Sequence, residues 1–168
     1  MTPGEQQTND FMALIKQHER LIHKVCNLYV VNSDEDYKDL YQEIILQTWS
    51  AFPKFKNEAK VSTWLYRVAL NTAISFKRNG NRLSQVPFDP SFMQVPDIGY
   101  DGNEEYLLLW QLIRHLPQLE KALILLYLEN NSYEEIAAIM GLTITNVGTR
   151  LGRVREKLKK QAQQQLTN

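Results

Sequence analysis

Residues 132–158 read SYEEIAAIMGLTITNVGTRLGRVREKL, the pattern of two helices joined by a tight turn. Ser132 can cap the first helix, and Glu135 at the third position after it can complete a capping box. Gly141 suits the left-handed conformation in which many helices end. These features predict a helix-turn-helix, a unit that is common among DNA-binding proteins.

The second helix of this unit has one apolar face and one polar face. Val147, Leu151, Val154 and Leu158 recur at helical spacing and predict the buried face. Thr143 or Thr145 can cap this helix. These threonines and the side chains outside the stripe suit bonds to base edges and phosphates in a major groove. They are Thr143, Thr145, Asn146, Thr149, Arg150 and Arg153. An ordinary helical hairpin is the alternative, but the glycine turn and the basic second helix together favour DNA binding.

Two glycines interrupt the polar face of this helix. Gly148 and Gly152 lie four residues apart and share a face. Each costs about 1 kcal/mol in a helix interior relative to alanine. They either let the helix backbone approach DNA closely or pack against a neighbouring helix, and the sequence leaves both explanations open.

The rest of the chain carries helical periodicity and no convincing strand-like alternation. Further helices are predicted over residues 9–31, 36–52, 61–78, 104–116 and 118–130. The tail at 161–168 is expected to be frayed, and the proline-containing segment 80–102, which has no sustained period, is typical of a linker. The expected fold is all-α, with two small helical domains at 9–79 and 103–162 joined by a flexible linker.

Charge is arranged in blocks, although the formal net charge is zero. Segments 54–82 and 150–160 are basic, and segments 34–43 and 97–105 are acidic. A solvated helix face is an adequate explanation for any one block. Zero net charge also suits a protein that binds DNA weakly on its own, if the acidic segments partly screen the basic ones.

Composition and motifs exclude several other classes of protein. Cys26 is the only cysteine, so no intrachain disulfide can form, and its apolar surroundings predict a buried spacer. The N-terminus lacks the pattern of a secretion signal, and no apolar run could span a bilayer, so we expect a soluble, intracellular protein.

The histidines do not predict an enzyme. His18 and His23 are five residues apart, about 140° around a helix, whereas a zinc protease motif needs a spacing of four. His115 is isolated, and the chain has no phosphate loop and no nucleophile–base pair. We therefore expect no catalytic residue, no metal site and no cofactor.

Residues 52–67, FPKFKNEAKVSTWLYR, interleave aromatic side chains with lysines. Such a segment can build a stacking platform for bases beside a charged rail for phosphates. In the helix that follows, Thr63, Arg67, Asn71 and Ser75 form a polar stripe at four-residue steps. The opposing stripe, expected to be core, consists of Leu65, Val68, Thr72 and Phe76, flanked by Trp64.

Two long segments resemble regions of one known family. DLYQEIILQTWSAFPKFKNEAKVSTWLYRVALNTAISFKR, residues 39–78, closely resembles region 2 of bacterial sigma factors in its D-L-x-Q-E opening, F-x-x-F loop and T-W-L-Y-R-x-A-x-N-T helix. LPQLEKALILLYLENNSYEEIAAIMGLTITNVGTRLGRVREKL, residues 116–158, resembles region 4. The chain is similar to sigma-70 family members of the extracytoplasmic-function group, which keep regions 2 and 4 and lack the region 3 domain.

The resemblance implies a function in transcription initiation. In the family, region 4 reads the −35 element in the major groove, and region 2 captures an unstacked base of the −10 element in a loop. The positions that this assigns to −10 DNA are Phe55, Lys56, Lys60, Ser62, Thr63, Arg67 and Asn71. At the −35 element, Gly148 and Gly152 stand where many members carry a large side chain, so no sequence preference follows. Here we expect base contacts from Asn146, Thr149 and Arg153.

The resemblance also implies partners. The acidic helix would dock on the coiled coil of the core RNA polymerase β′ subunit through Asp39, Leu40, Gln42 and Glu43, and the β flap is a second expected contact. Promoter DNA and a membrane-bound anti-sigma factor complete the set, with no small-molecule substrate and a cytoplasmic location. The alternative is a stand-alone helix-turn-helix regulator, which would need no docking helix and would usually need a dimerisation element.

Overall fold

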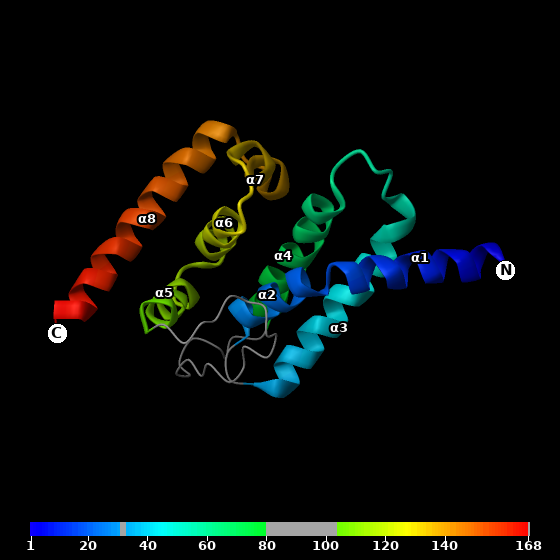
Figure 1. Ribbon diagram of the computed structural model, residues 1–168, viewed down its shortest axis with the longest axis horizontal. Helices are drawn as coiled ribbons and strands as arrows, with labels where there is room; N and C mark the ends of the chain where they lie inside the picture. Colours follow the sequence, from blue (N-terminus) through cyan, green and yellow to red (C-terminus); the bar gives the residue numbers. More distant parts are fainter. Residues whose placement is uncertain (31–32, 80–103, 168) are drawn as a thin grey trace. The chain divides into compact units, whose positions relative to one another are not determined.

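The structure, a computed structural model, describes residues 1–30, 33–79 and 104–167. All regular structure in these ranges is helical (Figure 1), so the predicted all-α class is confirmed. The chain divides into two compact units, Met1–Asn81 and Arg82–Asn168. The predicted linker at 80–102 lies outside the described residues.

The first unit is a helical bundle centred on one long helix. Its described elements are α1 (Pro3–Gln17), α2 (Glu19–Tyr29), α3 (Asp34–Ala51), the 3-10 turn η1 (Phe52–Lys54) and α4 (Val61–Asn79). Helix α4 packs against both α2 and α3. The three helices fully bury Ile22, Leu40, Ile44 and Leu65, which form the centre of this unit's core. Figure 1 shows α1 crossing this bundle and extending beyond it.

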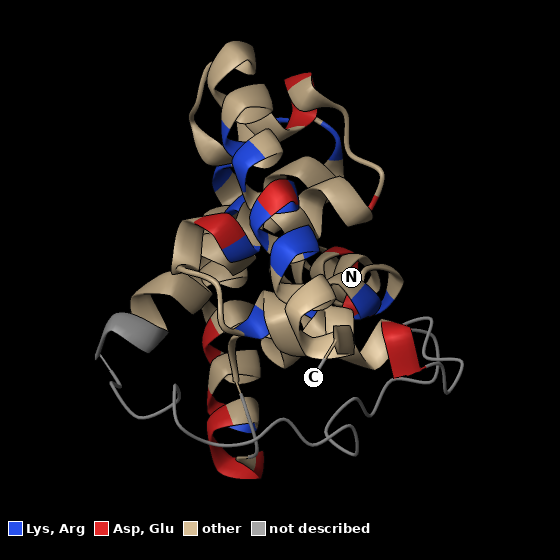
Figure 2. Cartoon of the chain, turned by 90° about the vertical axis from the view of Figure 1, so that its left-hand side faces the viewer, with Lys and Arg blue, Asp and Glu red and all other residues tan. Residues whose placement is uncertain are grey.

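Local sequence explains where α3 begins and ends. The Ser33 hydroxyl oxygen accepts a hydrogen bond of 3.2 Å from the Asp36 backbone N–H. Asp34, Glu35 and Asp36 make up the first turn, where their charge complements the helix dipole. Figure 2 colours acidic residues of this kind red along the backbone. The helix passes into η1 at Pro53, which has no N–H to continue the ladder. The predicted helix at 36–52 is confirmed within two residues.

The prediction of one continuous helix over 9–31 is wrong. The chain breaks at His18, whose backbone (φ −117°, ψ 17°) leaves the helical conformation between α1 and α2. The His18 ring nitrogen Nδ1 lies 3.0 Å from the Leu14 carbonyl oxygen, and the His18 backbone N–H donates to Leu14 and Ile15. No proline or glycine marks this position, so tertiary packing overrides an unbroken periodicity.

The buried face of α4 differs from the predicted stripe. Leu65 is buried as expected, but Val68, Thr72 and Phe76 are only half-buried. The helix also buries residues that the stripe omitted, because α4 contacts two helices and needs a wider apolar face. These residues are Thr63, Tyr66, Ala69, Leu70 and Ala73. Thr63 therefore belongs to the core and not to the exposed polar stripe.

The second unit packs three helices around one long helix. Its described elements are α5 (Glu104–Arg114), α6 (Gln118–Leu128), α7 (Tyr133–Met140) and α8 (Ile144–Thr167). Helices α5, α6 and α7 all contact α8. Pro117 separates α5 from α6, as predicted, by serving as the N-cap residue of α6. Within the described ranges no helix is long and apolar enough to cross a bilayer.

The expectation of a frayed tail is also wrong. Helix α8 continues through QAQQQLT to Thr167. Glutamine, alanine and leucine all have good helix propensity. The Thr167 hydroxyl donates to the Gln163 carbonyl oxygen at 2.9 Å, which adds a local hydrogen bond near the helix end.

Candidate nucleic-acid and polymerase interfaces

Helices α7 and α8 form the predicted helix-turn-helix. The Ser132 hydroxyl accepts from the Glu135 backbone N–H at 3.1 Å and caps α7. Gly141 ends α7 with φ 68° and ψ 35°, a left-handed conformation that favours glycine. Of the two candidate caps of α8, Thr143 is the one used: its hydroxyl accepts from the Asn146 backbone N–H at 3.1 Å. The Ser132 cap, the Gly141 turn and a threonine cap on α8 are therefore confirmed.

The outer face of α8 gathers the predicted −35 residues around one open hollow. Val147, Leu151, Val154 and Leu158 are all buried, as expected for the core stripe. The hollow is lined by Thr143, Thr145, Asn146, Thr149, Arg150 and Arg153, together with Glu120 of α6. The structure thus brings together all six residues named from the sequence. Glu120 was missed, because nothing in the sequence places α6 beside the first turns of α8.

Several basic side chains of α8 are held by neighbouring residues. Arg150 Nε donates to Asn146 Oδ1 at 2.6 Å, one helical turn away. Lys157 Nζ lies 3.6 Å from Glu120 Oε2, which links α8 to α6. The Arg155 guanidinium carbon sits 5.1 Å from the centre of the Tyr127 ring, a cation–π arrangement. The basic character of α8 is therefore partly committed to holding the unit together.

Neither glycine of α8 is required by packing inside the described structure. A Cβ added to Gly152 would meet no atom within 4 Å. A Cβ added to Gly148 would approach the Tyr133 ring at 3.5 Å, which is ordinary van der Waals contact. Packing against a neighbouring helix therefore does not explain Gly152, and it explains Gly148 only weakly.

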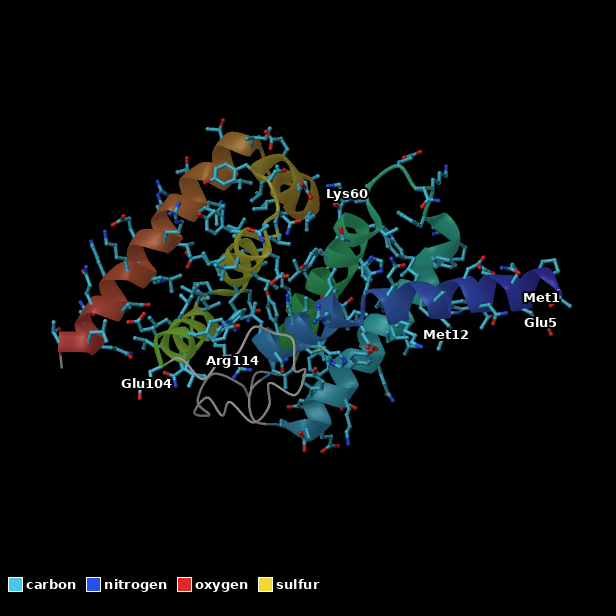
Figure 3. All side chains as sticks on the ribbon, viewed as in Figure 1. Met1, Glu5, Met12, Lys60, Glu104 and Arg114 are labelled. Carbon is cyan, nitrogen blue, oxygen red and sulfur yellow. The ribbon has the colours of Figure 1, made fainter. Side chains whose placement is uncertain are left out.

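The loop between η1 and α4 carries the predicted aromatic and basic residues. Phe55 stacks on Trp64 of α4, with ring centres 4.5 Å apart and planes inclined by 26°. Both rings are half-buried, so part of each ring remains exposed at the surface. Lys56 and Lys60 are exposed on this loop, and Figure 3 labels Lys60 where the chain enters α4. The stacked pair and the lysines thus share one edge of the first unit.

The residues assigned to −10 DNA on α4 do not all share one surface. Arg67 and Asn71 are exposed and one turn apart, and Ser62 is half-buried. Thr63 is only 7% exposed, so its side chain points into the core. Asn71 lies on a groove between α3 and α4 and not on the loop.

That groove between α3 and α4 contains three of the four docking residues expected from the sequence. Asp39, Gln42 and Glu43 line it from α3, next to the exposed Leu46. The α4 wall consists of Asn71, Thr72, Ser75 and Phe76. Leu40, also named for docking, is fully buried and packs in the core. The groove combines carboxylates with apolar side chains, and none of its lining residues is basic.

A small aromatic cluster joins α2 to α3. The His23 ring stacks on Tyr37 at 5.9 Å and lies 4.8 Å from the Tyr41 ring, and its Nδ1 bonds the Tyr37 hydroxyl. Burial lowers the pKa of His23 below its ordinary value, and the Glu19 carboxylate opposes this shift. Burial likewise raises the pKa of the Cys26 thiol to about 12, so the thiol stays protonated.

The expectation of no metal site concerns the histidines and the cysteine first of all. No group of three or more potential metal ligands occurs in the parts of the chain that the structure describes. His18 stands where α1 ends and α2 begins, and His23 lies within α2.

Both units match known protein-family regions. Residues 14–83 match sigma-70 region 2, and residues 106–158 match sigma-70 region 4. Among curated proteins, the chain is 31% identical to the RNA polymerase sigma factor YlaC of Bacillus subtilis (strain 168), over 75% of this chain and 77% of that protein. It is 29% identical to the ECF RNA polymerase sigma-E factor of Escherichia coli (strain K12), over 95% of this chain and 89% of the relative.

Two solved structures share the fold. One is CnrH in complex with the cytosolic domain of CnrY (TM-score 0.65, 21% identity, covering 91% of this chain and 87% of that one). The other is the sigma factor RpoE in complex with the anti-sigma factor NepR from Bartonella quintana (TM-score 0.68, 19% identity, covering 90% and 95%). With region 2 in the first unit, region 4 in the second and full-length relatives that are sigma factors, the chain belongs to the sigma-70 family, in the extracytoplasmic-function group, whose members direct promoter-specific transcription initiation.

Proposed function

We propose that the two units of this sigma factor divide promoter recognition between them. A domain at 103–162 reads the −35 duplex with α8, and a domain at 9–79 captures the −10 element as a single strand. The observation that carries this proposal is the hollow on α8, where six polar side chains converge on the exposed face of a helix-turn-helix. A recognition helix that reads base edges needs polar and basic side chains in this position.

The −10 role rests on the loop that precedes α4. The stacked Phe55–Trp64 pair offers an aromatic edge on which an unstacked base can lie, and Lys56 and Lys60 supply positive charge for phosphates beside it. Arg67 extends the charged edge along α4. Unstacking a base costs a few kcal/mol, which contacts made only to the single strand can offset. Binding and melting then become one equilibrium.

The groove between α3 and α4 is the proposed docking surface for the polymerase β′ coiled coil. Asp39 and Glu43 favour a basic partner, while Leu46 offers apolar area that Leu40, in the core, does not. Asn71 faces the same groove, so we assign it to polymerase docking in preference to −10 DNA. The β flap is the proposed contact of the second unit.

The protein's wider setting follows from the same assignment. It acts in the cytoplasm, where core polymerase and promoter DNA are found, and performs no catalytic step of its own. CnrH and RpoE were solved with CnrY and the anti-sigma factor NepR, which supports regulation of this chain by an anti-sigma factor. We propose that this factor is membrane-bound. The stand-alone regulator is the second candidate, favoured only by the helix-turn-helix itself.

Core binding separates these two candidates. Labelled full-length protein is titrated with sigma-free core RNA polymerase, and the dissociation constant is measured by fluorescence anisotropy. We expect the double variant Asp39→Lys, Glu43→Lys to bind about tenfold or more weakly, because like charges then face the basic partner. The matched control is Asp10→Lys, an exposed acid on α1 away from the groove.

Two results would count against the proposal. Failure of the wild-type protein to bind core polymerase would favour the stand-alone regulator. Equal binding by the groove variant and the Asp10→Lys control would show that polymerase docks on a surface other than this groove.

A further inference from the structure

The strongest unassigned interaction on the reading face is the bond between Arg150 and Asn146. The Arg150 Nε–H donates to Asn146 Oδ1 at 2.6 Å, the shortest side-chain hydrogen bond recorded around the hollow. Both side chains are exposed, and both line the hollow on α8. The bond therefore fixes a guanidinium at a surface where DNA is proposed to lie.

This hydrogen bond changes what each side chain can offer. An asparagine reads adenine by accepting a hydrogen bond at Oδ1 while its amide donates to the base. In Asn146 the bond to Arg150 takes one of the two lone pairs of Oδ1 and fixes the orientation of the amide, which disfavours turning it towards a base. In Arg150 the Nε–H is occupied, and the N–H groups of the two terminal nitrogens remain as an end-on fork. An end-on fork suits two acceptors in one plane, such as two phosphate oxygens.

The position of Arg150 around α8 decides which part of the DNA its guanidinium faces. At 100° per residue, Thr149 lies about 170° from the middle of the buried stripe, while Arg150 lies only about 70° from it. Thr149 therefore faces the floor of a groove that receives α8, and Arg150 faces its rim, where phosphates run. Glu120 lines the hollow on the same side, and its carboxylate pairs with Lys157 at 3.6 Å, which offsets its repulsion of a phosphate.

We propose that Asn146 is a positioning residue, which holds Arg150 as a preformed phosphate-binding fork at the rim of the reading face. Neither residue then reads a base, and specificity falls to Thr145, Thr149 and Arg153. This revises the expectation that Asn146 contacts bases, and it rests on the proposed binding of duplex DNA by α8. Fixing the guanidinium beforehand lowers the conformational entropy lost when DNA binds.

The test is a double-mutant cycle on DNA affinity and its salt dependence. Arg150→Ala, Asn146→Ala and the double variant are titrated, each as full chain with core polymerase, against promoter duplexes with every −35 base pair changed singly. The full chain alone is also titrated at low salt against a random duplex. Arg150→Ala should weaken binding equally on all duplexes and lower the salt slope by about 1.

Asn146→Ala should also weaken binding to every duplex, by roughly two- to tenfold, because Arg150 must then be ordered on binding. In the Arg150→Ala background it should change little, since the residue that it positions is gone. Gln163→Ala, an exposed polar change near the C-terminal end of α8, is the matched control and should leave affinity unchanged.

Two outcomes would overturn the inference. A loss in Asn146→Ala confined to one base pair would make Asn146 a base reader. Losses that simply add in the double variant would show that the two side chains act independently. Failure of the proposed function would look different: the wild-type complex would show no preference for promoter duplex over random duplex. The double-mutant coupling between Asn146 and Arg150, measured on the random duplex, would still decide the role of Asn146.

Discussion

At the scale of single residues, the glycines of α8 cost stability without serving an internal contact. Both stand in the interior of a regular helix, where glycine is unfavourable by about 0.5–1 kcal/mol relative to alanine. Space for a methyl group exists at both positions, fully at Gly152 and beside the Tyr133 ring at Gly148. A feature that weakens the free protein and faces outward is consistent with a role in approaching DNA.

Alanine at these positions should stabilise the protein. We expect Gly148→Ala and Gly152→Ala each to raise the free energy of unfolding by about 0.5–1 kcal/mol, measured by urea denaturation followed by circular dichroism. The gain at Gly152 should be at least as large, because its added methyl meets no neighbour.

The same variants decide what the glycines do for DNA binding. If α8 needs them to approach the duplex, affinity for promoter DNA falls although stability rises. Unchanged affinity in the stabilised double variant would reject close approach. A loss of stability at either position would contradict the packing described above.

At the scale of elements, α2 and α3 are joined by a histidine that is kept neutral. The His23 ring lies against Tyr37 and Tyr41 of α3, with Glu19 of α2 as the charged group that most affects it. Burial disfavours the imidazolium, and it outweighs the attraction of the Glu19 carboxylate. Protonating His23 should therefore loosen the packing of α2 on α3.

The sign of the resulting pH dependence follows from proton binding. The pKa of His23 is lower in the folded state, so the unfolded chain binds more protons as pH falls below about 6.5. The stabilising contribution of the neutral ring is complete above that pH and is lost as pH falls towards the folded-state pKa. Urea denaturation at pH 7.5, 6.5 and 5.5 should show the wild type losing more stability on acidification than His23→Gln. A difference between the two proteins that stays constant with pH would contradict this account.

Sequence reasoning was accurate where chemistry is local and failed where tertiary contacts decide. The caps at Ser132 and Thr143 and the turn at Gly141 were predictable, because each depends on neighbours within a few residues. The break at His18 was not, because no local signal opposes the helix there. The four-residue spacing in α4 put Thr63 on an exposed polar stripe, but its side chain is buried. A helix that packs on two others buries more than one stripe of residues.

The candidate sites divide in the same way. The grouping of the six residues proposed for −35 contact was predictable, because one helix presents nearly all of them. Glu120 and the shared position of Asn71 with Asp39 and Glu43 were not, because each depends on two helices meeting. Leu40 illustrates a further limit: a family motif places it beside docking residues, while its full burial gives it a structural role.

At the scale of the whole molecule, the proposed interaction surfaces are divided between two small units. The first unit carries the α3–α4 groove and the Phe55–Trp64 edge, and the second carries the α8 hollow. Because the formal net charge is zero, the basic edges have no overall positive field to support them. We therefore expect the free protein to bind promoter DNA weakly at physiological salt and to bind tightly only when polymerase presents both units together.

Run-off transcription from a promoter library tests this account most directly. Sigma-free core polymerase is supplied with a random-insert library, with and without the protein, and the transcripts are sequenced. We predict transcripts that appear only when the protein is present, with two shared upstream elements at −35 and −10. No transcripts, combined with tight retention of duplex DNA by the protein alone, would contradict the account and favour a stand-alone regulator.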